Sequence, residues 1–187
     1  MRICEHNNVP RDWEQHYAQP ENLKLAPTPL VLEVADLTAP GRALDLACGA
    51  GRNAFYLASC GWDVVAVDSS ATAVRALRDR GAVAGLRIDA RVADLESGGF
   101  AIEPEGYDLI CDFYYLQRDL FPKIREGIRP GGLFAAEIHL RDEQPHRFVL
   151  GPGELRREFE GWKILYYSEA VHRGHARPSA AIIARRG

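Results

Sequence analysis

Short apolar runs alternate with helical segments and glycine-containing turns from residue 43 onward. Strands are predicted at 43–48, 62–67, 86–92, 107–113 and 133–138, because each is a compact run rich in apolar residues. Helices are predicted between them at 52–60, from a cap at Ser69 or Ser70 through Arg80, and at 120–128. We expect Gly61 and Gly81 to end the first two helices and 129–132 to end the third. This alternation predicts a parallel sheet with helices on both faces.

The two ends of the chain depart from this pattern. Residues 1–25 are polar and predict a short helix or an arm, and Pro27 and Pro29 open a helix that Pro40-Gly41 stops. Near the other end, a helix at 154–159 precedes strands at 162–167 and 180–184, with no helix between these strands. Consecutive strands with a short connection should pair antiparallel.

The predicted fold class is therefore α/β: a Rossmann-like, doubly wound, mostly parallel seven-stranded sheet with an antiparallel C-terminal strand pair. We expect a single domain over 1–187, with a helical arm or lid at 1–40 and the cofactor-binding sheet at 41–187.

Composition and charge narrow the function. The 187 residues are 47% hydrophobic and 26% charged, a globular balance, and the net charge of −3 comes without a basic stripe. This argues against duplex nucleic acid as a partner and favours a small-molecule substrate. No apolar run is long enough for a membrane span, and the N-terminus lacks the apolar core of a signal peptide, so we expect a cytoplasmic protein. The cysteines are dispersed, with Cys48 and Cys111 in predicted strands, which favours reduced thiols and no metal site.

The segment from Asp45 to Asn53 leaves a strand and enters a helix. Gly49 and Gly51 allow positive φ and let a ligand approach the backbone, where the amides of a helix N-terminus face it. Nineteen positions after Gly49, Asp68 ends the second strand, and its carboxylate can accept hydrogen bonds from both ribose hydroxyls. Nicotinamide and flavin enzymes share this pattern, so an NAD(P)-dependent oxidoreductase is an open alternative.

The same segment resembles the first motif of class I S-adenosylmethionine-dependent methyltransferases. That motif is an acidic residue followed by small residues at alternate positions, matched here by Asp45, Ala47, Gly49 and Gly51, with alanine where glycine is commonest. The resemblance implies that the loop holds the methionine half of S-adenosylmethionine. It places the remaining cofactor contacts at the ends of later strands: the ribose at Asp68 and Ser69, the adenine at Asp94 and Leu95, and the sulfonium near Asp112 and Phe113.

Three further segments resemble the tellurite-resistance methyltransferases: Gly49-x-Gly51-Arg52-Asn53, the stretch from Gly153 to Tyr167, and the final Ala180 to Arg186. Members of this branch methylate soft chalcogen nucleophiles such as tellurite, selenium compounds and thiols. The resemblance implies that Arg52 lies beside the cofactor carboxylate. It also implies an active-site His-Arg pair, matched by His172 and Arg173. Because the connection to Ala180 is shorter than in the family, His175 is an alternative, and a solvated basic loop is another.

The sequence says less about which residues contact the methyl acceptor. Trp13 and Tyr17 belong either to a lid over the methyl group or to aromatic packing on the sheet, and Tyr17, Tyr114 and His139 are candidate substrate contacts. The favoured reaction is in-line transfer of the methyl group to a small-molecule nucleophile. A soft acceptor such as a thiol needs little help from a base, and no carboxylate–histidine pairing is evident. A cofactor-binding module without catalysis and a protein or nucleic-acid methyltransferase are alternatives.

Overall fold

The computed structural model describes residues 12–23, 26–142, 148–171 and 177–187. Seven strands form one sheet in the order β3-β2-β1-β4-β5-β7-β6. The strands are β1 (Arg42–Leu46), β2 (Asp63–Asp68), β3 (Ile88–Val92), β4 (Tyr107–Phe113), β5 (Ile128–His139), β6 (Lys163–Ala170) and β7 (Ser179–Arg185). The first five are parallel to one another, whereas β7 runs antiparallel to both of its neighbours.

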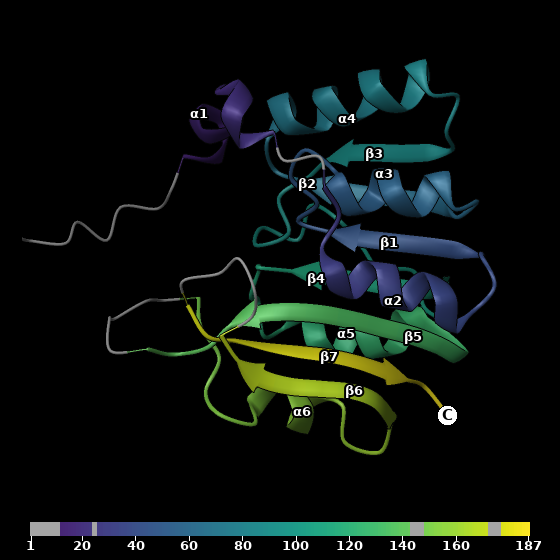
Figure 1. The fold of residues 1–187 in the computed structure, drawn as a ribbon, viewed down its shortest axis with the longest axis vertical. Coiled ribbons are helices and arrows are strands. Elements are labelled where there is room, and N and C mark those ends of the chain that lie inside the picture. Colours follow the sequence, from purple (N-terminus) through teal and green to yellow (C-terminus); the bar gives the residue numbers. More distant parts are fainter. Residues whose placement is uncertain (1–11, 24–25, 143–147, 172–176) are drawn as a thin grey trace, which may run out of the picture.

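Helices cover both faces of the sheet (Figure 1). In chain order the helices are α1 (Trp13–Tyr17), the short 3-10 helix η1 (Pro20–Asn22), α2 (Pro29–Leu37), α3 (Arg52–Ser59), α4 (Ala71–Val83), α5 (Leu120–Gly127) and α6 (Glu154–Glu158). Apolar residues of α2, α3 and α4 pack on one face, including Val31, Leu57 and Leu77. On the other face, α5 and the segment around α6 contribute Phe121 and Phe159. The buried core is thus divided between the two faces.

This architecture confirms the predicted fold class. The alternating pattern yields the parallel strands, and the strand pair after α6 is antiparallel, as its short connection requires. Because β7 lies between β5 and β6, the last two strands extend the sheet beyond the parallel part.

Three local predictions were wrong. The α4 helix does not end at Gly81 but continues to Val83, because the left-handed glycine that ends it is Gly85, with a φ of 65°, whereas Gly81 stays helical and packs against Ile88 of β3. Cys48 lies outside β1, because the chain leaves the strand at Ala47, whose φ is 48°. The fifth strand begins at Ile128, since that residue already pairs with Tyr107, so the Pro-Gly-Gly segment is an irregularity inside β5.

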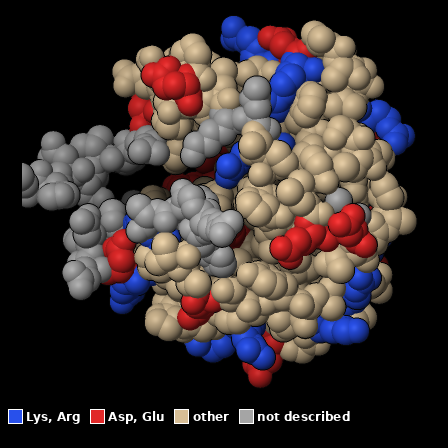
Figure 2. Space-filling model, in the orientation of Figure 1, with Lys and Arg blue, Asp and Glu red and all other residues tan. Residues whose placement is uncertain are grey.

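The carboxyl ends of the parallel strands all point to the side of the molecule where α1 lies (left in Figure 1). This edge is hollowed, and acidic atoms are visible at the floor of the hollow (Figure 2). Ligands of open α/β sheets bind at such an edge. None of the helices in the described part of the chain has the length and apolarity that a membrane span needs.

Candidate cofactor and active site

The glycine turn between β1 and α3 needs glycine for two reasons. Gly49 and Gly51 have φ values of 55° and 71°, in the left-handed region that side chains disfavour. A Cβ added to Gly51 would also overlap the Leu77 side chain, and one added to Gly49 would overlap the Tyr17 hydroxyl. Gly51 is the N-cap of α3, so the amides of the first turn of this helix open toward the strand ends.

Asp68 ties the end of β2 to this turn. Its Oδ2 atom accepts a hydrogen bond from the Gly49 amide at 2.8 Å, and its Oδ1 atom accepts one from the Ser70 amide at 2.9 Å. Burial raises the pKa of Asp68, although these amides act in the opposite direction. Each carboxylate oxygen still has a second lone pair, so the same group can accept ribose hydroxyls. Ser69, which lies between Asp68 and Ser70 in the chain, is exposed.

Asp45 and Asp112 are buried beside the turn. The Oδ2 atom of Asp45 accepts a hydrogen bond from the Ala54 amide at 3.1 Å, so Asp45 lies beneath the loop. Burial raises the pKa of Asp45 to about 7, despite the nearby Arg52 guanidinium. Asp112, near the end of β4, is equally buried, and its pKa is raised well above the usual range by burial and by the charge of Asp45. Its Oδ1 atom has no hydrogen-bond partner among the described residues.

The predicted adenine and sulfonium residues lie along the same edge. Asp94 follows β3 and is exposed, with its Oδ1 atom accepting from the Glu96 amide at 2.9 Å. Leu95 and Phe113 are buried, on opposite faces of the sheet. The structure therefore brings these residues to the strand ends, while their contacts with a cofactor stay a prediction.

A second group of side chains surrounds Tyr114, directly after β4. The Arg52 guanidinium carbon lies 5.5 Å from the centre of the Tyr114 ring, and the His139 ring centre lies 5.3 Å from it. Glu137 is buried on β5, and its Oε1 atom accepts a hydrogen bond from the Ser179 hydroxyl of β7 at 2.8 Å. Burial and the Glu137 carboxylate raise the pKa of Tyr114.

Sequence reasoning missed Glu137 and Ser179. A lone carboxylate inside the apolar run from Leu133 to Ile138 was a signal that could have drawn attention to Glu137. Ser179 carried no such signal, because the two residues are 42 positions apart. The predicted catalytic residues His172 and Arg173, with the alternative His175, lie outside the described residues.

The α1 helix is docked on the start of α4. The Glu14 carboxylate accepts hydrogen bonds from the Ser70 hydroxyl at 2.7 Å, from the Thr72 amide at 3.0 Å and from the Thr72 hydroxyl. These contacts lower the pKa of Glu14. They also bring Tyr17, from the same helix, against Gly49. The arm thus reaches the glycine turn, which is where a lid over the cofactor would have to lie.

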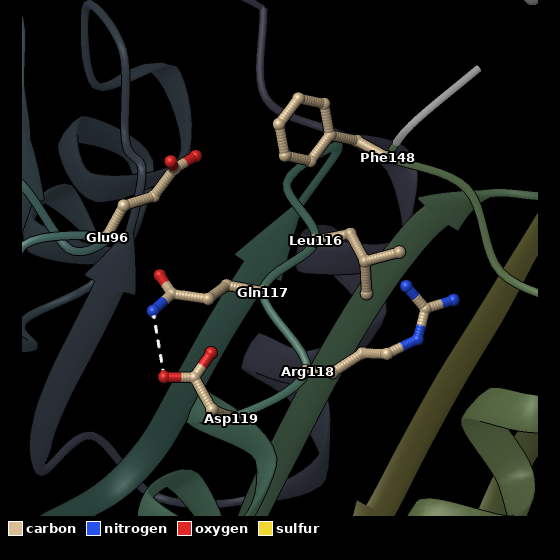
Figure 3. A pocket seen from close by; sticks show the side chains of 6 residues that line it. All are labelled: Glu96, Leu116, Gln117, Arg118, Asp119 and Phe148. Carbon is tan, nitrogen blue, oxygen red and sulfur yellow. Dashed lines mark hydrogen bonds between the residues drawn. The ribbon is translucent and has the colours of Figure 1, made fainter.

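Beside this edge, a pocket of about 330 Å³ lies between the loops that follow β3 and β4. Figure 3 shows Glu96 and Phe148 at its two sides and Gln117 hydrogen-bonded to Asp119 at 3.2 Å. The Arg118 guanidinium, which also lines it, is paired with Glu154 at 2.6 Å. Within the described ranges, no group of His, Cys, Asp and Glu side chains is arranged to hold a metal ion.

The sheet order, with the antiparallel β7 and the glycine turn at the carboxyl edge, defines a Rossmann-like fold of the kind found in class I methyltransferases. The chain belongs to the family of the tellurite resistance protein TehB, whose pattern it matches over residues 13–180. The crystal structure of TehB from Haemophilus influenzae superposes with a TM-score of 0.77 at 23% identity, covering 94% of this chain and 67% of that one.

Two curated relatives are similar to this chain over about half of their own length. A protein named hemagglutinin 1 from Eikenella corrodens is 34% identical over 158 residues, covering 78% of this chain and 52% of the relative. A probable S-adenosyl-L-methionine-dependent methyltransferase TehB from Haemophilus influenzae is 29% identical over 157 residues, covering 78% of this chain and 54% of the relative. The chain thus spans about half the length of the curated relatives it matches.

Proposed function

We propose that this chain transfers a methyl group from S-adenosylmethionine to a small-molecule nucleophile with a soft chalcogen atom, such as a thiol or a selenium or tellurium compound. One observation carries the proposal. Every buried charged side chain among the described residues is acidic, and all lie toward the carboxyl ends of the parallel strands: Asp45, Asp68, Asp112 and Glu137. Such an edge favours a cationic ligand, and the sulfonium and ammonium groups give S-adenosylmethionine a net positive charge.

The charge at this edge also separates the proposal from its main rival. A nicotinamide dinucleotide would bring its anionic pyrophosphate to the glycine turn, beside Asp45 and Asp68. With a pKa of about 7, Asp45 is partly ionised at neutral pH, and its negative charge disfavours the pyrophosphate. The Oδ1 atom of Asp112, which has no partner among the described residues, can accept a hydrogen bond from the cofactor's ammonium group. The residues present therefore fit S-adenosylmethionine better than a dinucleotide.

When bound, S-adenosylmethionine supplies a methyl group already activated by its positive sulfur. Held at this edge, that group would offer its methyl carbon to a lone pair of the acceptor, and the sulfur would keep the electron pair of the broken bond as S-adenosylhomocysteine. The protein's part is to orient the two reactants and to exclude water. Tyr17 and Tyr114 are suited to this by position, one against the glycine turn and one after β4.

The family match supports a soft chalcogen nucleophile as the methyl acceptor. Such nucleophiles also react without a strong base, because a thiol is partly ionised at neutral pH. His172 and Arg173 stay our predicted catalytic pair, and the cytosol our predicted location, in keeping with free Cys48, Cys60 and Cys111.

The first experiment is calorimetric titration of the protein with S-adenosylmethionine and, separately, with NADH. The test variant is Asp68→Ala. A matched control is Asp63→Ala, because Asp63 is exposed and lies at the opposite end of the same strand. We expect S-adenosylmethionine to bind and the test variant to weaken binding by at least about tenfold, which corresponds to about 1.4 kcal/mol. The control should bind as the wild type does.

A methyl-transfer assay then screens thiols, selenite and tellurite as acceptors, with S-adenosylhomocysteine as the measured product. Binding of NADH without binding of S-adenosylmethionine would replace the proposal with an oxidoreductase. Cofactor binding without turnover on any small acceptor would favour a binding module or a methyltransferase of macromolecules, and a peptide or RNA substrate would distinguish these.

A further inference from the structure

Glu137 is a buried carboxylate that the cofactor motifs do not account for. It is 5% exposed in β5, where its neighbours in the strand are apolar. It belongs to none of the ion pairs formed among the described residues, and its Oε1 atom is held instead by the Ser179 hydroxyl. Burying a carboxylate without a cation costs folding free energy, so packing alone does not explain this residue.

Tyr114 is held by Glu137 through both main chain and side chain. Its φ is 65°, in a region that is strained for a residue with a bulky side chain. The Tyr114 amide donates to the Glu137 carbonyl oxygen at 2.7 Å, and the Tyr114 hydroxyl lies within hydrogen-bonding reach of the Glu137 carboxylate. Arg52 and His139 flank the ring. Backbone strain that the surroundings maintain is concentrated at functional sites.

The strand order places this pair at the methyl end of the proposed cofactor. With the ribose at Asp68 on β2 and the methionine at the turn after β1, the edge continues toward β4 and β5. Tyr114 follows β4, and Glu137 lies on the next strand, so the backbone of Glu137 is about 10 Å from β1, or two spacings between strands. This placement of Tyr114 and Glu137 at the methyl end of the cofactor rests on the proposed function.

The other two buried carboxyl groups near β4 are weaker sources of negative charge. Burial raises the pKa of both Asp45 and Asp112, which weakens them as anions at neutral pH. One oxygen of Glu137 accepts a hydrogen bond from the Ser179 hydroxyl, whereas one oxygen of Asp112 has no partner among the described residues.

We propose that Glu137 is a positioning residue that acts with Tyr114 to make the methyl end of the cleft selective for charge. It favours cationic S-adenosylmethionine over neutral S-adenosylhomocysteine. Methyl transfer breaks the bond between sulfur and the methyl carbon and leaves the electron pair on sulfur, so the positive charge at that atom disappears. The same carboxylate that attracts the cofactor then no longer retains the product.

The test measures the dissociation constants of S-adenosylmethionine and S-adenosylhomocysteine for the whole chain by calorimetry. The decisive quantity is the ratio of the two constants. Glu137→Gln removes the charge but keeps the size of the side chain, and Tyr114→Phe removes only the hydroxyl. Ser179→Ala is the matched control, because it removes a hydrogen bond to Glu137 and keeps the carboxylate.

We expect Glu137→Gln to reduce the preference for S-adenosylmethionine roughly tenfold, as for a unit charge at about 10 Å in a medium of effective dielectric constant near 20. Tyr114→Phe should reduce it by a smaller factor, and Ser179→Ala should leave the ratio near the wild-type value. A merely structural role would weaken both ligands equally, and such an outcome overturns the inference.

Circular dichroism and urea unfolding establish that each variant is folded. If Glu137→Gln does not fold, Tyr114→Phe decides the matter, and an unchanged ratio for that variant overturns the inference. A wild-type protein that binds neither ligand would overturn the proposed function and this inference together. A wild-type protein that binds both leaves the proposed cofactor in place, so the ratio then tests the charge selectivity alone.

Discussion

Asp45 makes the stability of this protein depend on pH in a direction opposite to that of most carboxylates. Burial raises the pKa of Asp45 to about 7 in the folded protein, whereas an aspartate in an unfolded chain has a pKa of about 3.9. The folded state therefore holds a proton that the unfolded state has lost between these two values. The stability that this proton provides is fully present below about pH 4 and is lost as the pH rises through about 7.

Asp45→Asn is the perturbation that isolates this contribution. The amide oxygen of asparagine can still accept the hydrogen bond from the Ala54 amide, so the loop keeps its anchor. The variant has no proton to lose. Linkage with the two pKa values gives an ionisation cost of roughly 1.5 kcal/mol at pH 5 and roughly 4 kcal/mol at pH 8 in the wild type. The variant should thus gain roughly 2–3 kcal/mol of stability relative to the wild type between these pH values.

Urea unfolding followed by circular dichroism at pH 5, 6, 7 and 8 measures this gain. Asp63→Asn is the control, since it makes the same chemical change at an exposed side chain, at the start of β2. If the curves of the wild type and of Asp45→Asn stay parallel across the range, Asp45 is ionised in the folded protein and the reasoning from its burial is wrong.

Three other changes test separate parts of the structure. Gly51→Ala puts a Cβ at positive φ and against Leu77. We expect it to lower the free energy of unfolding, measured with urea, by about 1–3 kcal/mol and to abolish cofactor binding in calorimetry. Unchanged stability would contradict the packing of the turn. Glu14→Gln weakens the docking of α1 on Thr72, which should raise hydrogen exchange in α1 while the sheet stays protected. Phe159→Ala removes a buried ring whose centre lies 4.3 Å from that of Phe134, and should cost about 3–5 kcal/mol of unfolding free energy; a loss below 1 kcal/mol would refute its place in the core.

The sequence by itself determined the order of elements and the position of the glycine turn. Alternating apolar runs and helical segments are local properties, and they predict a parallel sheet whose strand ends share one edge. Asp68 could be singled out in the same way, because its distance from Gly49 along the chain reflects one strand, one helix and one turn. The ends of individual elements were harder to predict. Gly81 was predicted to end a helix, but it lies inside α4 and packs against Ile88.

Only the tertiary structure decided which polar groups meet at that edge. Glu14 contacts Thr72 across 58 positions, and Ser179 contacts Glu137 across 42. Such pairs leave no periodic trace in the sequence, because they depend on the order of strands in the sheet and on where the arm docks. Burial is equally non-local. The sequence shows Asp45 and Glu137 as acidic residues within apolar runs, but only the layers packed over them bury their carboxyl groups and give that burial chemical consequences.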